Sequence, residues 1–237
     1  MSGKPIIELI NADIFQQDVK VLSEVNALID EGEFVYLVGK VGSGKSSLIK
    51  TLNGELPLQN GHCSVAGFDL RKLKTKDLAL LRRKLGVVFQ DFRLLSDRTI
   101  YKNLEFVLKA TGWKNRQTMH DRINEVLESV GMLESAQKMP HRLSGGEQQR
   151  IAIARAILNH PSIILADEPT GNLDPETSEE ILNLLKEQNK NGITIVMASH
   201  DYILLGKHRA RTIVCEDGKI KDTARFEGNV DFESLLE

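Results

Sequence analysis

Short apolar runs recur along the chain, and each is bounded by turn residues or glycine. They are rich in Val, Ile and Leu and too short for helices, which is typical of strands buried in a sheet. We predict strands at 6–10, 34–38, 87–89, 162–166 and 193–198. A longer apolar stretch at 19–29 and the pair Asn60-Gly61, a hairpin turn signal, suggest an antiparallel β region beside the main sheet.

Between the strands, apolar residues recur with the 3.6-residue period of amphipathic helices. We predict helices at 45–53, 77–84, 146–158 and 175–191, with Gly86 ending the second. The segment 99–142 is helical: Ile100, Leu104, Val107 and Leu108 share one face, Ile123, Val126, Leu127 and Val130 another, and Gly112 and Gly131 are the stops. Asp217-Gly218 predicts a final hairpin, and residues 224–237 are expected to form a loosely packed tail. The whole pattern predicts an α/β fold with a helical insert.

Composition narrows the function classes. The 237 residues suit one large α/β domain, and Cys63 and Cys215 fit a reducing compartment better than a disulfide scaffold. The formal net charge of −2 argues against non-specific nucleic-acid binding as the main task. No apolar run approaches the roughly 18–20 residues of a membrane helix. We therefore expect a cytoplasmic protein that meets a membrane only through a partner.

A glycine-rich loop follows the predicted strand 34–38 and opens the predicted helix 45–53. It matches the phosphate-binding pattern G-x-x-x-x-G-K-[ST], in which backbone N–H groups surround phosphates at a helix N-terminus. The predicted nucleotide contacts are Gly39, Lys40, Val41, Gly42, Ser43, Gly44, Lys45, Ser46 and Ser47. Lys45 should reach the β- and γ-phosphates of the nucleotide, and the Ser46 hydroxyl should bind Mg²⁺.

The strand 162–166 leads directly into Asp167 and Glu168. Because parallel sheets bind ligands at the carboxyl ends of their strands, Asp167 is expected to hold Mg²⁺, and Glu168 to act on a water as general base. We expect the two side chains to point in different directions, since consecutive strand residues face opposite sides. Without the phosphate loop, two exposed loop acids would be the better interpretation.

A third segment, Ser144-Gly145-Gly146-Glu147, begins the predicted helix 146–158. Ser144 and Glu147 have the spacing of a capping box, and two glycines at a helix start leave N–H groups open to an anion. From the Ser144–Glu147 spacing alone, a well-capped structural helix is the better interpretation. The full run 143–149 is a longer and more specific pattern than the Ser144–Glu147 spacing.

Taken together, these segments resemble the nucleotide-binding domains of the ABC family. The run 143–148 is similar to the family signature, the run 39–46 to the Walker A motif, and the run 163–168 to the Walker B motif. The segment 171–174 is similar to the D-loop. Gln90 matches the Q-loop glutamine, and His200 matches the H-loop histidine. The motifs follow in the family's order from 39 to 200. The resemblance implies a P-loop NTPase (RecA-like) core with an antiparallel β subdomain and an inserted helical subdomain at about 91–150, in a single nucleotide-binding domain covering 1–237.

The resemblance also implies a mechanism. Two copies would form a homodimer around two ATP molecules, with Ser144, Gly145 and Gly146 of one chain meeting the γ-phosphate held by the other. Gln90 would bind Mg²⁺ or the water, His200 would contact the γ-phosphate, and Asp174 would link the two sites.

Phe15 stands where the family usually stacks a tyrosine on adenine. Stacking and simple core packing are equally open for this ring.

The segments 86–95, 97–104 and 170–174 resemble the FtsE family of cell-division ATP-binding proteins, which works with the membrane protein FtsX. The alternative is the ATPase of a lipoprotein-release, macrolide-efflux or amino-acid transport system. A soluble clamp on DNA or ribosomes is disfavoured because long coiled coils and a second cassette are lacking. A kinase or GTPase would leave 143–149 unexplained. One basic cluster is better interpreted as a solvated helix face, with a surface for anionic lipid headgroups as the alternative: Arg71, Lys72, Lys74, Lys76, Arg82, Arg83 and Lys84.

Overall fold

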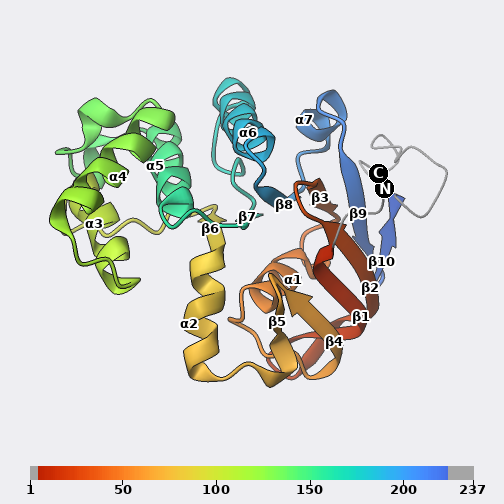
Figure 1. Cartoon of the computed structure of the whole chain (residues 1–237). Helices are drawn as coiled ribbons and strands as arrows, with labels where there is room; N and C mark the ends of the chain where they lie inside the picture. Colours follow the sequence, from red (N-terminus) through yellow and green to blue (C-terminus); the bar gives the residue numbers. More distant parts are fainter. Residues whose placement is uncertain (1–4, 224–237) are drawn as a thin grey trace.

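Two β-sheets organise the residues that the computed structural model describes, 5–223 (Figure 1). The larger has the order β10-β9-β3-β8-β7-β6, in which β9, β3, β8, β7 and β6 are parallel and β10 pairs antiparallel with β9. Its strands are β3 (Phe34–Val38), β6 (Leu85–Phe89), β7 (Ile163–Asp167), β8 (Thr194–Ser199), β9 (Arg211–Glu216) and β10 (Lys219–Asp222). The predicted strands of the main sheet are confirmed to within a residue or two, a shift that is ordinary for strand ends. The tail predicted at 224–237 lies outside the described residues.

The smaller sheet is antiparallel and has the order β2-β1-β4-β5. It consists of β1 (Pro5–Gln16), β2 (Val19–Asp30), β4 (Asn60–Val65) and β5 (Phe68–Asp69). The hairpin turn predicted at Asn60-Gly61 is wrong, because these residues begin β4. They lie where the β1–β4 register shifts, and Gly61 has a φ of +79° with no room for a Cβ against the Asn11 backbone. The pair therefore marks an irregularity in a strand and not a reversal of the chain.

The helices are α1 (Lys45–Leu52), α2 (Thr75–Lys84), α3 (Ile100–Ala110), α4 (Arg116–Ser129), α5 (Gly145–Ile157), α6 (Pro175–Lys190) and α7 (Tyr202–Lys207), with 3₁₀ turns at Leu70–Lys72, Leu133–Ser135 and Pro140–Arg142. Gly112 and Gly131 follow α3 and α4 with φ values of +95° and +70°, so both predicted stops are confirmed. Gly86 does not end α2 but lies inside β6. A Cβ there would come within 2.6 Å of the Ala156 carbonyl oxygen, so this glycine lets α5 pack closely on the sheet.

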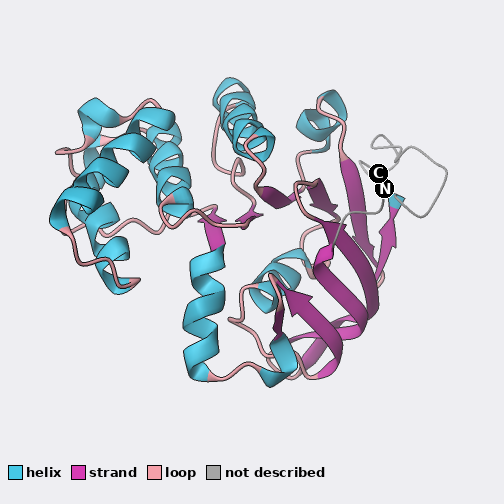
Figure 2. Cartoon of the chain, viewed as in Figure 1, coloured by secondary structure: helices cyan, strands magenta, loops and turns pink. Residues whose placement is uncertain are grey.

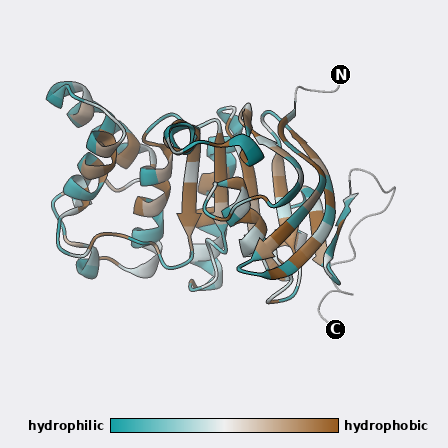
Figure 3. Ribbon diagram, turned by 90° about the horizontal axis from the view of Figure 1, so that it is seen from below, coloured by the Kyte–Doolittle hydropathy of each residue, from teal (hydrophilic) through white to brown (hydrophobic). Residues whose placement is uncertain are grey.

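The two faces of the larger sheet bury two separate cores. Along β3, Tyr36 and Val38 face one core, which is shared with α3, α4, α5 and α6, while Val35 and Leu37 face the other, shared with α1 and the smaller sheet. Figures 2 and 3 show helices on both sides of a sheet whose strands are mainly hydrophobic. Because side chains alternate along a strand, a run that is apolar at every position must be covered on both sides.

This topology brings four strand ends to one edge of the sheet. Val38 of β3 pairs with Ser199 of β8, and Asp167 of β7 pairs with Ala198 of β8 and with Phe89 of β6. The segments that follow these strands are the phosphate loop, Glu168, His200 and Gln90. The fold thus brings residues from four distant parts of the sequence to the carboxyl edge, where parallel sheets bind ligands.

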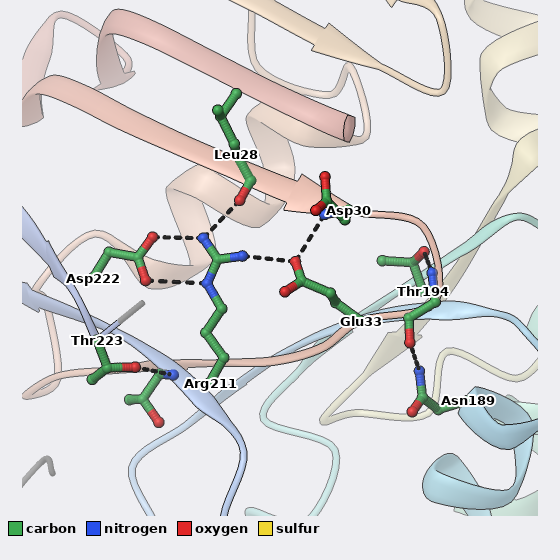
Figure 4. A network of polar contacts seen from close by, with 10 residues as sticks. Leu28, Asp30, Glu33, Asn189, Thr194, Arg211, Asp222 and Thr223 are labelled. Carbon is green, nitrogen blue, oxygen red and sulfur yellow. Dashed lines mark hydrogen bonds and ion pairs between the residues drawn. The ribbon is translucent and has the colours of Figure 1, made fainter. Parts of the chain in front are cut away.

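Arg211 connects the end of the larger sheet to the smaller one (Figure 4). Its guanidinium donates to Asp222 of β10 at 2.6 and 3.1 Å, to Glu33 at 2.7 Å and to the Leu28 carbonyl of β2 at 2.6 Å. Asp222 is only 3% exposed. The planar fork of arginine satisfies three partners from three segments at once, which joins the β9–β10 hairpin to the turn between β2 and β3.

Candidate nucleotide site

The phosphate loop is shaped by glycines with backbone angles that other residues avoid. Gly39, Gly42 and Gly44 have φ values of +149°, +84° and +98°, and Gly44 is the N-cap of α1. A Cβ on Gly39 would collide with the carbonyl oxygen of Cys215 in β9. The first N–H groups of α1 have no partners within the helix. Ser43 adds a buried Oγ that has no hydrogen-bond partner among residues 5–223, so the loop offers an unused polar group to an anion.

Lys45 brings its charge into the centre of this loop. Its side chain is almost fully buried, and Nζ donates to the carbonyl oxygens of Gly39 at 2.6 Å and Lys40 at 3.2 Å. The same Nζ lies 3.8 Å from Oε1 of Glu168. A buried ammonium held by carbonyls of a glycine-rich loop provides strong attraction for a phosphate group that replaces those carbonyls.

Ser46 and Asp167 form a pair of hard oxygen ligands. Ser46 Oγ donates to Oδ1 of Asp167 at 2.8 Å. Burial raises the pKa of Asp167, and the hydrogen bond from Ser46 opposes that shift. Among residues 5–223 there is no group of three or more His, Cys, Asp or Glu side chains able to hold a metal ion. Two protein oxygens, supplemented by water and substrate phosphate, are the set that Mg²⁺ prefers at nucleotide sites, so the residues fit this ion.

Glu168 lies between Lys45 and His200. Its Oε2 is 2.9 Å from His200 Nδ1 and accepts from the His200 backbone N–H at 3.3 Å. We expected its direction to follow from strand alternation, and that reasoning is wrong because β7 ends at Asp167. Glu168 lies one residue beyond the strand and has a φ of +50°, an uncommon angle for a residue other than glycine. The Glu168 carboxylate is thus held between the side chains of Lys45 and His200 at the carboxyl edge of the sheet.

Ser144, Gly145 and Gly146 lie on a different part of the chain from this cluster. The predicted capping box is confirmed: Ser144 Oγ accepts from the Glu147 N–H at 3.2 Å, and Glu147 accepts from the Ser144 N–H at 2.7 Å. A Cβ on Gly146 would lie 2.5 Å from Cγ2 of Thr177. No hydrogen bond or ion pair within 5–223 joins these three residues to Lys45, Ser46, Asp167, Glu168 or His200.

Asp174 caps α6, as the Asp-Pro pair predicts. Its carboxylate accepts from the Thr177 N–H at 3.0 Å and from the Thr177 hydroxyl at 2.6 Å, and these hydrogen bonds lower the pKa of Asp174. Thr177 is also the residue that would collide with a side chain at Gly146. The start of α6 and the start of α5 therefore pack against each other, and the predicted cap is confirmed.

Gln90 does not join the Ser46–Asp167 pair. Its Nε2 donates to Oδ1 of Asn172 at 3.0 Å, and a Cβ on Gly171 would lie 2.8 Å from the same nitrogen. Sequence reasoning missed Asn172 as a partner of Gln90. The sequence signal for Asn172 was its position in the segment 171–174, which is similar to the D-loop.

Phe15 lies at the end of β1, half-buried, and belongs to neither core. The next residue, Gln16, accepts a hydrogen bond from Ser47 Oγ at 3.2 Å, which holds the end of β1 against α1. Simple core packing is therefore the weaker interpretation of Phe15. Gln16 was not predicted, because a polar residue at a strand end has no distinctive local pattern.

The family assignment follows from this geometry and from sequence similarity. The family model of the ABC transporter matches residues 22–171. The chain therefore belongs to the ABC transporter family, in which it is an ATP-binding and ATP-hydrolysing subunit with a P-loop NTPase fold.

Within that family the chain is similar to cell division ATP-binding proteins named FtsE. It is 45% identical to FtsE of Streptococcus pneumoniae strain D39 over 92% of this chain and 94% of that protein. It is 45% identical to FtsE of Mycobacterium tuberculosis over 84% and 86%, and 43% identical to FtsE of Bacillus subtilis over 90% and 93%.

Solved structures agree with this assignment. The dimeric ATP-binding cassette MJ0796 with bound ADP and Pi has a TM-score of 0.80 and 34% identity, covering 93% of this chain and 100% of that one. The cassette cbiO1 of Clostridium perfringens, part of the ABC transporter complex cbiONQ, has a TM-score of 0.83 and 29% identity, covering 92% and 87%.

Proposed function

We propose that two copies of this chain close around two ATP molecules, and that hydrolysis lets them separate. The observation that carries this proposal is the separation of two anion-binding segments on one chain. Lys45 and His200 each contact Glu168, while within 5–223 Ser144 and Gly146 have no hydrogen bond or ion pair to these three residues. A second copy related by a two-fold axis would complete each site with the missing half. The solved structure of the MJ0796 cassette is dimeric, which supports this arrangement.

In the proposed site, the loop 39–46 and Ser47 bind the β- and γ-phosphates, and Phe15 stacks on the adenine. Ser46 and Asp167 would hold Mg²⁺, with Gln90 joining when nucleotide enters, and the ion would neutralise charge on the phosphates. Glu168 takes a proton from the attacking water, and His200 orients that carboxylate. Ser144, Gly145 and Gly146 of the partner copy contact the γ-phosphate, and Asp174 joins the two sites.

We propose that the whole chain, 1–237, is one nucleotide-binding domain with a helical subdomain at about 91–150, and that it acts on an integral membrane subunit of the FtsX kind in cell division. No helix within 5–223 is both long enough and apolar enough to cross a membrane.

The proposed partner surface is α3, where Arg98, Lys102, Phe106 and other residues line a cavity of about 330 Å³. Phe106 is 51% exposed there, with the Arg98 guanidinium 5.2 Å from its ring. A half-exposed aromatic ring beside a cavity is typical of a protein contact. This partner would hold the chain at the inner face of the membrane.

Purification from the protein's own cells tests the partner. Glu168→Gln protein should retain ATP and hold the closed complex, so it is isolated in detergent with ATP and the bound membrane subunit is identified. The control is Lys45→Ala, which should bind no ATP and therefore capture less of the ATP-stabilised complex. An FtsX-like subunit supports the cell-division role. A lipoprotein-release, efflux or importer permease would replace that role and leave the ATPase proposal intact.

A further inference from the structure

A strongly cationic surface covers α2 and the turn before it. Residues 71–84 contain seven Lys or Arg and one Asp, a formal charge of +6, whereas the whole chain has −2. The rest of the chain must therefore carry −8, so positive charge is concentrated on this element. All seven cations are exposed: Arg71, Lys72, Lys74, Lys76, Arg82, Arg83 and Lys84. We call residues 71–84 the basic face.

The basic face has almost no neutralising partners of its own. Lys72 pairs with Asp69 at 3.4 Å, and Arg71 donates to the Gly61 carbonyl at 3.4 Å. Among the ion pairs of residues 5–223, none involves the other five cations. The exposed Lys109 and Lys221, in contrast, each pair with a glutamate at 2.8 Å. Like charges close together on a helix repel each other, so an anionic ligand would relieve a real cost here.

An apolar side chain lies in the middle of these cations. Lys76, Leu80 and Arg83 follow at spacings of four and three, so they share one side of α2, and Leu80 is 47% exposed. The opposite side carries Leu81, which is fully buried in the core. An apolar residue flanked by flexible cationic side chains is the pattern of helices that lie on a lipid surface. The segment has no aromatic residue with which to stack nucleic-acid bases.

The basic face also adjoins α3. A Cβ built on Gly112, in the turn after α3, would lie 3.4 Å from an Arg83 guanidinium nitrogen. The Arg83 side chain, near the carboxyl end of α2, therefore reaches the turn that follows α3, the helix that carries the proposed partner surface. If a membrane subunit docks on α3, the lipid around that subunit is the nearest extended anionic surface.

We propose that the basic face binds the headgroups of anionic phospholipids, beside the membrane subunit. This inference rests on the proposed function, because it needs the chain to be held at a membrane. Each Lys or Arg near an anionic bilayer contributes about fivefold in affinity. The Debye length is about 8 Å at physiological ionic strength, so binding should weaken as salt increases.

The test is co-sedimentation of the purified full chain with vesicles of phosphatidylcholine, with and without roughly one third phosphatidylglycerol. We expect salt-sensitive binding to the anionic vesicles only. Lys76→Glu/Arg83→Glu should weaken it at least about 25-fold, the product of two fivefold losses. The matched control is Lys190→Glu/Lys207→Glu, which makes the same charge change at exposed ends of α6 and α7 and should bind like wild type. Leu80→Gln should weaken binding without changing its salt dependence.

Three outcomes would overturn the inference: no binding to anionic vesicles, equal losses in the two charge-reversal variants, or binding of duplex DNA at the same salt without binding of vesicles. The Lys76→Glu/Arg83→Glu variant should retain wild-type ATPase activity in detergent, because neither residue contacts the nucleotide site. An unchanged, Glu168-dependent ATPase together with absent lipid binding would leave the proposed function standing and reject only the lipid surface.

Discussion

Glu168 combines an uncommon backbone angle with two charged neighbours. Its φ is +50°, and its carboxylate lies 2.9 Å from His200 Nδ1 and 3.8 Å from Lys45 Nζ. Such an angle is uncommon outside glycine and persists only where the surroundings enforce it. The motif named the residue, but only the structure showed where its carboxylate points.

Replacing Glu168 by Gln removes the proton acceptor and keeps the shape. We expect ATP turnover to fall about 10²–10⁴-fold while ATP affinity stays near wild type. Phosphate release and equilibrium nucleotide binding measure the two effects separately. Glu134→Gln, on an exposed carboxylate, is the control and should change neither quantity. Turnover within threefold of wild type would exclude Glu168 as the base.

Asp167→Asn tests the cost of a half-buried carboxylate in the nucleotide-free protein. Burial raises the pKa of Asp167, so the native state holds this proton more tightly than the unfolded chain. The stabilising contribution is present at acid pH and is lost as pH rises through the folded-state pKa. At pH 7 without Mg²⁺, the Asn variant should therefore melt above wild type, because an amide at this position carries no charge to desolvate.

The same experiment predicts a pH trend. The difference in Tm should shrink towards acid pH, where Asp167 is itself protonated. The variant should also lose Mg²⁺-dependent ATPase activity, since an amide is a poorer ligand for this ion. Asp18→Asn, in an exposed turn, serves as control. A variant that melts below wild type at pH 7 would contradict the argument.

At the scale of elements, local signals predicted helix ends well and long-range packing poorly. Ser144 and Asp174 cap α5 and α6, and each cap depends on a residue three positions further along the chain. Gly86 and Gly61, by contrast, were misinterpreted as a helix stop and a turn. Their actual neighbours, Ala156 and Asn11, are distant in sequence, so no local pattern reveals them.

The Arg211 network gives a prediction for this scale. Arg211→Met removes the cation from Glu33 and from the buried Asp222, and breaking a buried ion pair typically costs about 3–5 kcal/mol. At about 3 kcal/mol the Tm should fall by roughly 6–12 °C. Thermal unfolding followed by circular dichroism measures this change.

The matched control lies on the neighbouring strand. Lys221 pairs with Glu216 at 2.8 Å on an exposed surface, so Lys221→Met should cost no more than about 1 kcal/mol. Equal losses in the two variants would mean that the Arg211 network stabilises no more than an exposed ion pair.

At the scale of the whole molecule, the prediction is that the nucleotide site is shared between two chains. Lys45→Ala and Ser144→Arg damage different halves of the proposed composite site. Each variant alone should be nearly inactive, but mixing them in equal amounts should restore about a quarter of wild-type ATPase activity. Half of the randomly formed dimers are mixed, and each mixed dimer has one intact site of two. Activity of the mixture is measured by phosphate release.

The control for this mixing experiment uses two lesions in the same half. Lys45 and Glu168 belong to one chain's contribution, so Lys45→Ala mixed with Glu168→Gln should recover no activity. Absence of rescue in both mixtures would contradict the shared site. Rescue in both would mean that the halves are assigned incorrectly.

The sequence by itself determined the parallel strands of the main sheet, most helices, the caps and the types of chemistry available. Each of these depends on residues within a few positions of one another, as in the run Gly39 to Ser46. Only the tertiary structure decided that Gln90 meets Asn172 across 82 positions, that Glu168 turns towards His200, and that Arg211 joins two sheets. These contacts depend on which distant segments the sheet brings together. Interactions between residues that are neighbours in the chain do not determine that arrangement, so no local pattern predicts these contacts.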